Sequence, residues 1–190
     1  GLMGRPMALH LEKAGHALHL WARRADALAP FAGVNAKTHA TPAAVAANAD
    51  VVITMVADAP DVEQVCLGAE GLAAGGRAGL IVVDMSTINP NAARRIGERL
   101  AAKGIEFLDA PVSGGETGAI NAALTIMVGG KPEVFGKVKP LFEKMGKSVT
   151  LIGGAGAGQV AKACNQILTG VGVLAVAEAF NFAAKSGVDP

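Results

Sequence analysis

One lysine near the end of the sequence has the surroundings of a proton donor. Lys162 lies in a segment, residues 159–186, that holds almost no other charge, and the flanking cations are Lys147 and Lys185. Asn165 follows three residues later and therefore shares one helical face with Lys162. An ammonium group partly removed from water can act as a general acid beside a carbonyl, with its pKa lowered toward neutrality. The alternative is a lysine whose tip simply reaches solvent.

A serine followed by two glycines is a candidate carboxylate-binding loop. Ser113, Gly114 and Gly115 come shortly after the apolar run Ile105–Ala110. If that run is a strand, the three residues lie at the carboxyl edge of a sheet, where open α/β folds bind ligands. A hydroxyl beside closely approachable backbone N–H groups suits a carboxylate. An ordinary tight turn would need only one glycine.

The first residues could hold the phosphates of a dinucleotide. Gly1 and Gly4 match the last two glycines of a G-x-G-x-x-G turn, with Leu2 and Met3 between them. Such a turn lets a pyrophosphate approach the N–H groups at the start of a helix. The first glycine and the first strand would then precede Gly1. The alternative is a glycine turn of the kind that opens many helices.

The residues expected to meet the adenosine ribose favour a phosphorylated cofactor. About 18 residues after Gly4 a predicted strand ends at Ala22, Arg23 and Arg24. An acidic residue there would bind the 2′-hydroxyl of NAD, whereas arginine suits the 2′-phosphate of NADP. Ala22 offers no acid, so NADP is favoured and NAD remains possible. Two solvated arginines are the alternative.

Apolar runs of strand length alternate with segments of helical period. Strands are predicted at Ala17–Ala22, Asp50–Val56, Leu80–Met85, Ile105–Ala110, Leu124–Val128 and Val149–Ile152. Helices are predicted at Pro6–Ala14, Pro42–Asn48, Asp61–Leu67, Pro90–Lys103 and Pro132–Met145. Near-continuous apolar strands between helices indicate an α/β domain: a Rossmann-type, doubly wound, mostly parallel sheet.

The pattern changes after the glycine-rich stretch that precedes Gln159. Residues 159–186 show no strand signal and are apolar on most sides, which predicts one long helix buried between two domains. We therefore expect a dinucleotide-binding domain over residues 1–154, lacking its first strand. Residues 155–190 would begin an all-α domain. Both ends of the chain are interpreted as cut, so the chain is expected to be a fragment.

Composition excludes several classes of protein. Hydrophobic residues make up 51% of the 190 residues, charged residues 17%, and the net charge is +1. That balance argues against nucleic-acid binding and against disorder. The most membrane-like stretch, residues 163–184, carries polar groups such as Asn165 and Glu178 that would be costly in lipid. With no signal-peptide pattern and two distant cysteines, Cys66 and Cys164, a reduced cytoplasmic protein is expected.

Three further patterns suggest sites that the sequence does not support. Gly146-Lys147-Ser148 ends like a P-loop, but it precedes a strand and lacks the first glycine. His16 and His19 have no acidic or cysteine partners, so no metal is expected. Asp84 and Asp109 end separate strands, and nothing in the sequence brings them together.

Five motifs in one order resemble the β-hydroxyacid dehydrogenase family along the whole chain. They are GLMGRPMA, DMSTINP, DAPVSGG, MVGG and GAGQVAKACNQ. The resemblance implies an NAD(P)-dependent oxidoreductase that interconverts a small β-hydroxyacid and its semialdehyde. The Asn165-Gln166 pair is closer to reductases of 2-hydroxy-3-oxopropionate (tartronate semialdehyde) than to 3-hydroxyisobutyrate dehydrogenases, which remain the alternative.

The resemblance also implies roles for particular residues. Lys162 would be the catalytic lysine, Asn165 would help hold the substrate, and the loop at residues 113–115 would bind its carboxylate. Thr87, with Val56 and Ala57, would line the nicotinamide side of the cofactor. The family's C-terminal helical domain would complete the substrate pocket and form a homo-oligomer. A non-catalytic dinucleotide-binding module is the alternative from another class, but it would have no need of Lys162.

Overall fold

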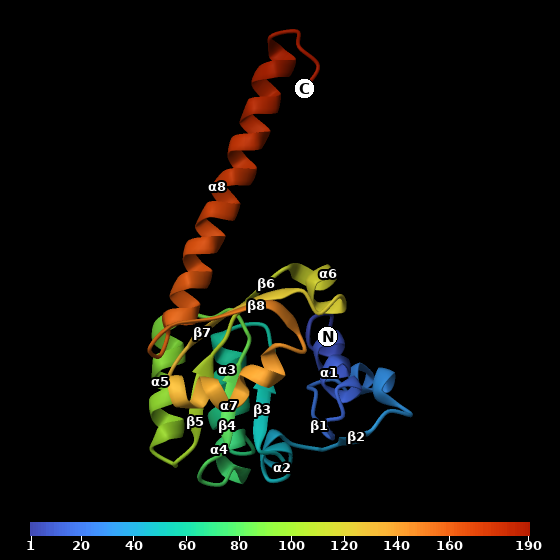
Figure 1. Cartoon of the computed structure of the whole chain (residues 1–190), viewed down its shortest axis with the longest axis vertical. Coiled ribbons are helices and arrows are strands. Elements are labelled where there is room, and N and C mark those ends of the chain that lie inside the picture. Colours follow the sequence, from blue (N-terminus) through green and yellow to red (C-terminus); the bar gives the residue numbers. More distant parts are fainter.

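The computed structural model describes residues 1–190, in which helices and strands alternate until one long final helix (Figure 1). The strands are β1 (Leu18–Leu20), β2 (Ala36–Thr38), β3 (Val51–Thr54), β4 (Ile81–Asp84), β5 (Glu106–Asp109), β6 (Val112–Ser113), β7 (Leu124–Gly129) and β8 (Gly146–Gly153). The helices are α1 (Gly4–Lys13), a 3-10 helix η1 (Ala25–Phe31), α2 (Pro42–Ala46), α3 (Ala59–Leu67), α4 (Leu72–Gly75), α5 (Pro90–Ala101), α6 (Gly115–Ile120), α7 (Pro132–Phe142) and α8 (Ala157–Lys185).

The main sheet has six strands and is mostly parallel. Its order is β3-β4-β5-β7-β6, with β8 paired to β7. β3, β4 and β5 run parallel, as do β7 and β8, whereas β7 is antiparallel to β5 and β6. All four residues of β4 are buried, as expected of a central strand covered on both faces. The predicted Rossmann-type α/β fold is therefore confirmed.

Two hydrophobic cores lie on opposite faces of this sheet. Alternate residues of β4 divide between them: Val82 packs with α3, α4 and α5, whereas Ile81 and Val83 pack with α1 and α7. The apolar face of α5 supplies one core through Ile96 and Leu100. Each core joins residues from distant parts of the sequence, so the sheet and its helices stabilise one another.

Helix starts follow capping signals that the sequence carries. The Asn89 side chain accepts hydrogen bonds from the N–H groups of Asn91 and Ala92 at the start of α5, which begins at Pro90. Thr41 caps α2 in the same way through the N–H of Ala44. Every predicted strand and helix is present, with shorter ends in most cases. The short elements β2, β6, η1, α4 and α6 were not predicted, because so few residues carry too little periodicity.

β1 and β2 form a separate two-stranded parallel sheet beside β3. A cavity of about 920 Å³ lies between this pair and the main sheet, and its lining includes Leu18 of β1 and Val52 of β3. The facing edges of β1 and β3 pair with no strand of the chain. A strand ahead of Gly1 stays a prediction, and these free edges leave room for one.

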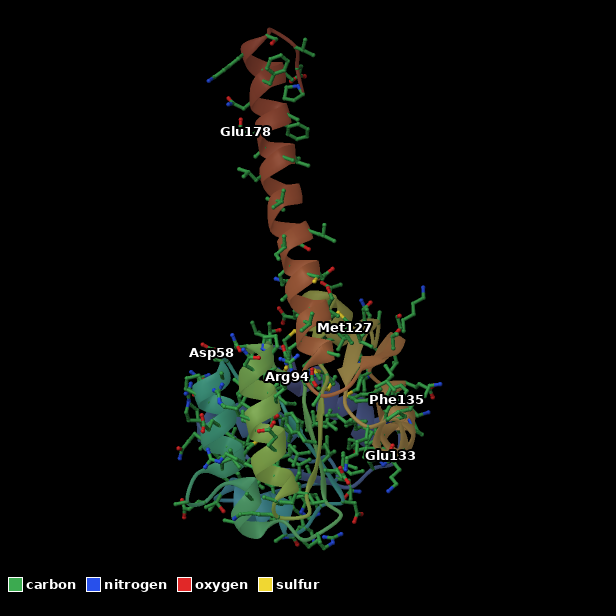
Figure 2. All side chains as sticks on the ribbon, turned by 90° about the vertical axis from the view of Figure 1, so that its left-hand side faces the viewer. Asp58, Arg94, Met127, Glu133, Phe135 and Glu178 are labelled. Atoms are coloured by element: carbon green, nitrogen blue, oxygen red, sulfur yellow. The ribbon has the colours of Figure 1, made fainter.

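Helix α8 differs from the expectation of a helix buried along its length. Its buried residues are Gly158, Gln159 and Lys162, all in its first two turns. The remainder projects away from the domain, with Glu178 far from the sheet (Figures 1 and 2). Large apolar side chains on this projecting part, such as Leu168, which is 75% exposed, stay in contact with solvent because no element of residues 1–190 packs against them. By length and composition alone α8 could also span a membrane.

The first turn of α8 lies directly on the sheet, which gives a test of this packing. A Cβ on Gly158 would overlap the Met127 carbonyl oxygen and lie 2.8 Å from that of Asp109. We expect Gly158→Ala to lower the free energy of unfolding by about 1–3 kcal/mol, measured by urea denaturation. Gly170→Ala, with nothing within 4 Å, is the matched control and should raise it by up to about 1 kcal/mol. Equal stability of Gly158→Ala and the unmodified chain would contradict this contact.

Candidate active site at the carboxyl edge of the sheet

Three polar residues align at the carboxyl ends of β3, β4 and β5. Thr54 is the register partner of Asp84, and Asp84 is the register partner of Asp109. All three are buried, with exposed fractions of 4% for Thr54 and 0% for both aspartates. The expectation that nothing brings Asp84 and Asp109 together is therefore wrong. Parallel strands in register place their ends at one edge, even though the two residues are far apart in sequence.

Asp84 is a carboxyl group with half of its hydrogen-bonding capacity unused. Its Oδ1 accepts hydrogen bonds from Thr54 Oγ1 (2.8 Å) and from the N–H of Ser86 (3.2 Å). Its Oδ2 is buried without a partner. Burial raises the pKa of Asp84 to about 6; the hydrogen bonds from Ser86 and Thr54 oppose this shift, and the charge of Asp109 adds to it.

Asp109 connects the sheet to the start of α8. Its Oδ1 accepts a hydrogen bond from the N–H of Gly156 (2.7 Å), and its Oδ2 accepts one from the N–H of Gln159 (2.9 Å). Burial raises the pKa of Asp109, although the N–H groups around the carboxylate lower it in part. A negative charge at the N-terminus of a helix is also favoured by the helix dipole. The carboxylate thus satisfies N–H groups that the helix itself leaves unpaired.

Lys162 lies one turn further along α8 and is only 8% exposed. Burial lowers the pKa of its ammonium group. Its Nζ forms no hydrogen bond with the rest of the chain, and it is not among the fully buried polar atoms that lack a partner, so the amine is not completely enclosed. The side chain is therefore largely, though not completely, buried. Half-buried Asn165 follows on the same face of the helix.

The predicted carboxylate loop lies on a neighbouring strand of the same sheet. Ser113 ends β6 and pairs with Thr125 of β7, the strand on which the first turn of α8 rests. Gly114 and Gly115 follow with φ angles of 128° and 60°, which residues with side chains rarely adopt. Both glycines are exposed and Ser113 is half-buried. The loop and the first turn of α8 thus both adjoin β7, and no hydrogen bond joins the loop to Lys162.

Most of the predicted cofactor residues gather around the cavity between β1 and β3. Its lining includes Gly1, Gly4, Ala22, Arg23, Arg24, Val56 and Ala57. Leu2, Met3 and Thr87 are not part of this lining, and Leu2 is 71% exposed. Thr87 instead lies exposed in the loop after β4. The structure thus groups the phosphate and ribose candidates with Val56 and Ala57, whereas Lys162, Asn165 and the Ser113 loop are not part of this lining.

These residues fit a dinucleotide. α1 begins at Gly4 without a side-chain cap; Arg5 donates its N–H to the Gly1 carbonyl (3.1 Å) and Pro6 has no N–H, so the N–H of Gly4 is the first-turn group left for a phosphate. Arg23 forms an ion pair with Asp61 of α3 (3.1 Å), and Arg24 one with Asp26 (3.6 Å). Both arginine side chains are more than three-quarters exposed, so these pairs are weak and leave the guanidinium groups accessible.

Comparison with known proteins identifies the family. Residues 1–153 match the model of the NAD binding domain of 6-phosphogluconate dehydrogenase. Residues 156–190 match that of the NAD-binding domain of NADP-dependent 3-hydroxyisobutyrate dehydrogenase. The chain belongs to the β-hydroxyacid dehydrogenase family. It represents the part that binds a nicotinamide dinucleotide.

Individual relatives agree with this assignment. Over its whole length the chain is 44% identical to 2-hydroxy-3-oxopropionate reductase of Escherichia coli K12 and 40% identical to 3-hydroxyisobutyrate dehydrogenase of Pseudomonas aeruginosa. It spans 65% and 64% of their lengths. The solved structure of Mycobacterium tuberculosis 3-hydroxyisobutyrate dehydrogenase with L-serine superposes on the whole chain with a TM-score of 0.94 at 35% identity, and the chain covers 64% of it.

The polar residues that connect these sites were not predicted from the sequence. Gln159 is 1% exposed, accepts a hydrogen bond from the N–H of Ile88 (3.0 Å) and donates one to the Ser86 carbonyl (2.8 Å). Ser86 Oγ in turn accepts a hydrogen bond from the N–H of Val56 (3.0 Å). A glutamine in a nearly uncharged helical segment was a usable signal, because a buried amide needs partners. Its partners lie 71 and 73 residues away and could not be named.

The raised pKa of the buried Asp84 carboxyl should make the stability of the fold depend on pH. A raised pKa means that the folded state binds the proton more tightly than the unfolded state does. Stability is therefore lost as pH rises from the usual value of 3.8 to about 6, and it stays lower above that range. Asp84→Asn should remove this dependence, so its stability relative to the unmodified chain should rise by on the order of 3 kcal/mol between pH 3.5 and pH 7. Urea denaturation at each pH measures the difference.

The control for this experiment is Asp189→Asn, at an exposed position near the C-terminus. It should leave the pH dependence of unfolding unchanged. Parallel stability curves for the Asp84→Asn chain and the unmodified chain across this range would show that Asp84 ionises in the folded state as it does in the unfolded state.

Proposed function

We propose that the whole protein interconverts a small β-hydroxyacid and its semialdehyde with a nicotinamide dinucleotide. The observation that carries the proposal is Lys162: an almost fully buried lysine with a lowered pKa, near the start of α8 beside the carboxyl edge of a dinucleotide-binding sheet. A non-catalytic binding module would not need a desolvated proton donor there.

The residues have distinct roles in this proposal. When bound, the dinucleotide would supply a hydride to the carbonyl carbon or accept one from the alcohol. Lys162 gives its ammonium proton to the carbonyl oxygen as negative charge develops there, and it takes the proton back in the reverse reaction. Ser113, Gly114 and Gly115 hold the substrate carboxylate, and Asn165 orients the substrate. Gly1, Leu2, Met3 and Gly4 approach the pyrophosphate, while Thr87, Val56 and Ala57 border the nicotinamide.

The favoured substrate is 2-hydroxy-3-oxopropionate, reduced to glycerate. The 44% identity to a reductase of that name and the Asn165-Gln166 pair support this choice. 3-Hydroxyisobutyrate is the alternative, since a dehydrogenase of that name is 40% identical. NADP is favoured over NAD because Ala22 offers no acid to a ribose hydroxyl, whereas Arg23 and Arg24 offer two accessible guanidinium groups.

The test is a steady-state assay of the full-length protein with both substrates and both cofactors. Turnover should be most efficient with 2-hydroxy-3-oxopropionate and NADPH. Lys162→Met should lower kcat by at least about 100-fold and leave the Kd of NADPH nearly unchanged, because a general acid contributes to the chemical step. Lys185→Met, in the last turn of the same helix, is the matched control and should keep full activity.

Two outcomes would overturn parts of this proposal. If Lys162→Met kept kcat within a few-fold of the unmodified protein, the proton donor would be another group. A preference for NADH of tenfold or more would reject the cofactor choice, and greater efficiency with the hydroxyisobutyrate pair would reject the substrate.

We also propose a domain boundary between residues 154 and 155 and a homo-oligomer in the whole protein. The dinucleotide-binding unit ends just after β8, and α8, which begins the second domain, exposes large apolar side chains along its length, including Leu168, Val171 and Phe182. Such a surface is covered in a stable soluble protein, by further chain or by a second copy. Light scattering of the full-length protein should give a dimer or larger, and a monomeric mass would contradict the oligomer.

A cytoplasmic location without nucleic-acid or membrane partners stays a prediction.

A further inference from the structure

The side chain of Gln159 connects two parts of the proposed active site, α8 and the loop after β4. Its Oε1 accepts a hydrogen bond from the N–H of Ile88 and its Nε2 donates one to the carbonyl of Ser86. Thr87, the residue between these two partners, is exposed while both of its neighbours are buried. The amide therefore fixes the backbone on both sides of Thr87 and leaves Thr87 itself free.

Gln159 also belongs to the helix that carries the proton donor. Its own N–H donates to Asp109 Oδ2, and Lys162 follows three residues later on the same helical face. The Thr87 loop and Lys162 come from different elements, β4–α5 and α8. The side chain of Gln159 joins α8 to the loop between β4 and α5, and its backbone N–H joins α8 to Asp109 at the end of β5.

We propose that Gln159 is a positioning residue that fixes the Thr87 loop and Lys162 relative to each other. The inference rests on the proposed function, because it matters only if Thr87 borders the nicotinamide and Lys162 donates the proton. Hydride and proton must reach adjacent atoms of one carbonyl group. A displacement of about 1 Å between two such groups can cost on the order of 100-fold in rate.

The connection extends to the other cofactor-side segment. The carbonyl of Ser86 accepts a hydrogen bond from Gln159, and its hydroxyl oxygen accepts one from the N–H of Val56. The resulting chain of hydrogen bonds runs from the end of β3 through the loop after β4 to the first turn of α8. Replacing Gln159 by an apolar residue leaves the buried N–H of Ile88 and the buried carbonyl of Ser86 without this partner, so the loop should shift to satisfy them.

The first test compares Gln159→Leu with Arg94→Leu in the full-length protein. Arg94 lies on α5 at the base of α8 (Figure 2) and donates to the carbonyl of Ala155, so its removal loosens the same helix start without touching the Thr87 loop. We expect Gln159→Leu to lower kcat 10- to 100-fold with the Kd of NADPH changed less than threefold, under conditions where the variant is folded. Arg94→Leu should keep kcat within threefold.

A second readout does not depend on activity. Hydrogen exchange at residues 86–88, measured without cofactor, should become faster in Gln159→Leu, whereas exchange in β4 (Ile81–Asp84) should be unchanged. Arg94→Leu should show normal exchange in both segments. Unchanged exchange at residues 86–88 in Gln159→Leu would overturn the proposed link, and so would equal kcat losses in the two variants.

Gln159→Glu adds a pH signature that a general loss of stability would not give. A neutral carboxylic acid can reproduce both hydrogen bonds, with its hydroxyl donating to Ser86 and its carbonyl accepting from Ile88. A carboxylate cannot donate, and it would place a further negative charge beside Asp109. The activity of Gln159→Glu relative to the unmodified protein should therefore fall at least tenfold as pH rises from 5 to 8. A constant ratio would overturn the proposal.

Failure of the proposed function is distinguishable from failure of this inference. If the unmodified full-length protein turned over neither substrate, the function would be wrong. The exchange measurement would still report whether Gln159 holds the Thr87 loop.

Discussion

The buried carboxylate of Asp109 at the start of α8 is the interaction on which the arrangement of the site depends. It ends β5 at the sheet's carboxyl edge and accepts the N–H groups of Gly156 and Gln159. A helix that begins on a sheet buries N–H groups that have no partner within the helix, and an unpaired buried donor is costly. Asp109 removes that cost and in the same contact fixes where α8 begins. The position of Lys162 follows, because one turn of a helix is a rigid spacer.

The same edge of the sheet combines two electrostatic environments. At the ends of β4 and β5, burial raises the pKa values of Asp84 and Asp109, so negative charge is disfavoured in the interior. Burial acts on Lys162 as well, but there it lowers the pKa, because the charged form of a lysine is the protonated ammonium. An ammonium with a lowered pKa releases its proton more readily. This suits a group that must donate a proton to a developing oxyanion and recover it afterwards.

Close backbone approach makes this packing possible. Gly129 of β7 and Gly158 of α8 meet where a side chain on either would overlap the other's surroundings: a Cβ on Gly129 would lie 2.7 Å from the Gly158 nitrogen. The helix can therefore rest against the strand itself and not against a layer of side chains. That proximity brings the first turn of α8 within hydrogen-bonding range of both Asp109 and the loop after β4. The rest of α8 has no such surface within residues 1–190, and it projects from the domain.

The sequence alone determined what depends on neighbouring residues. Apolar strands, the helices between them and the shared helical face of Lys162 and Asn165 all arise from local periodicity and side-chain type. β2 and β6 were too short for that signal. Only the tertiary structure placed Asp84 opposite Asp109, gathered Gly4 and Arg24 around one cavity, and joined Gln159 to Ile88 across 71 residues. Parallel strand pairing and helix docking decide such contacts, and both join residues whose separation in sequence carries no repeating pattern.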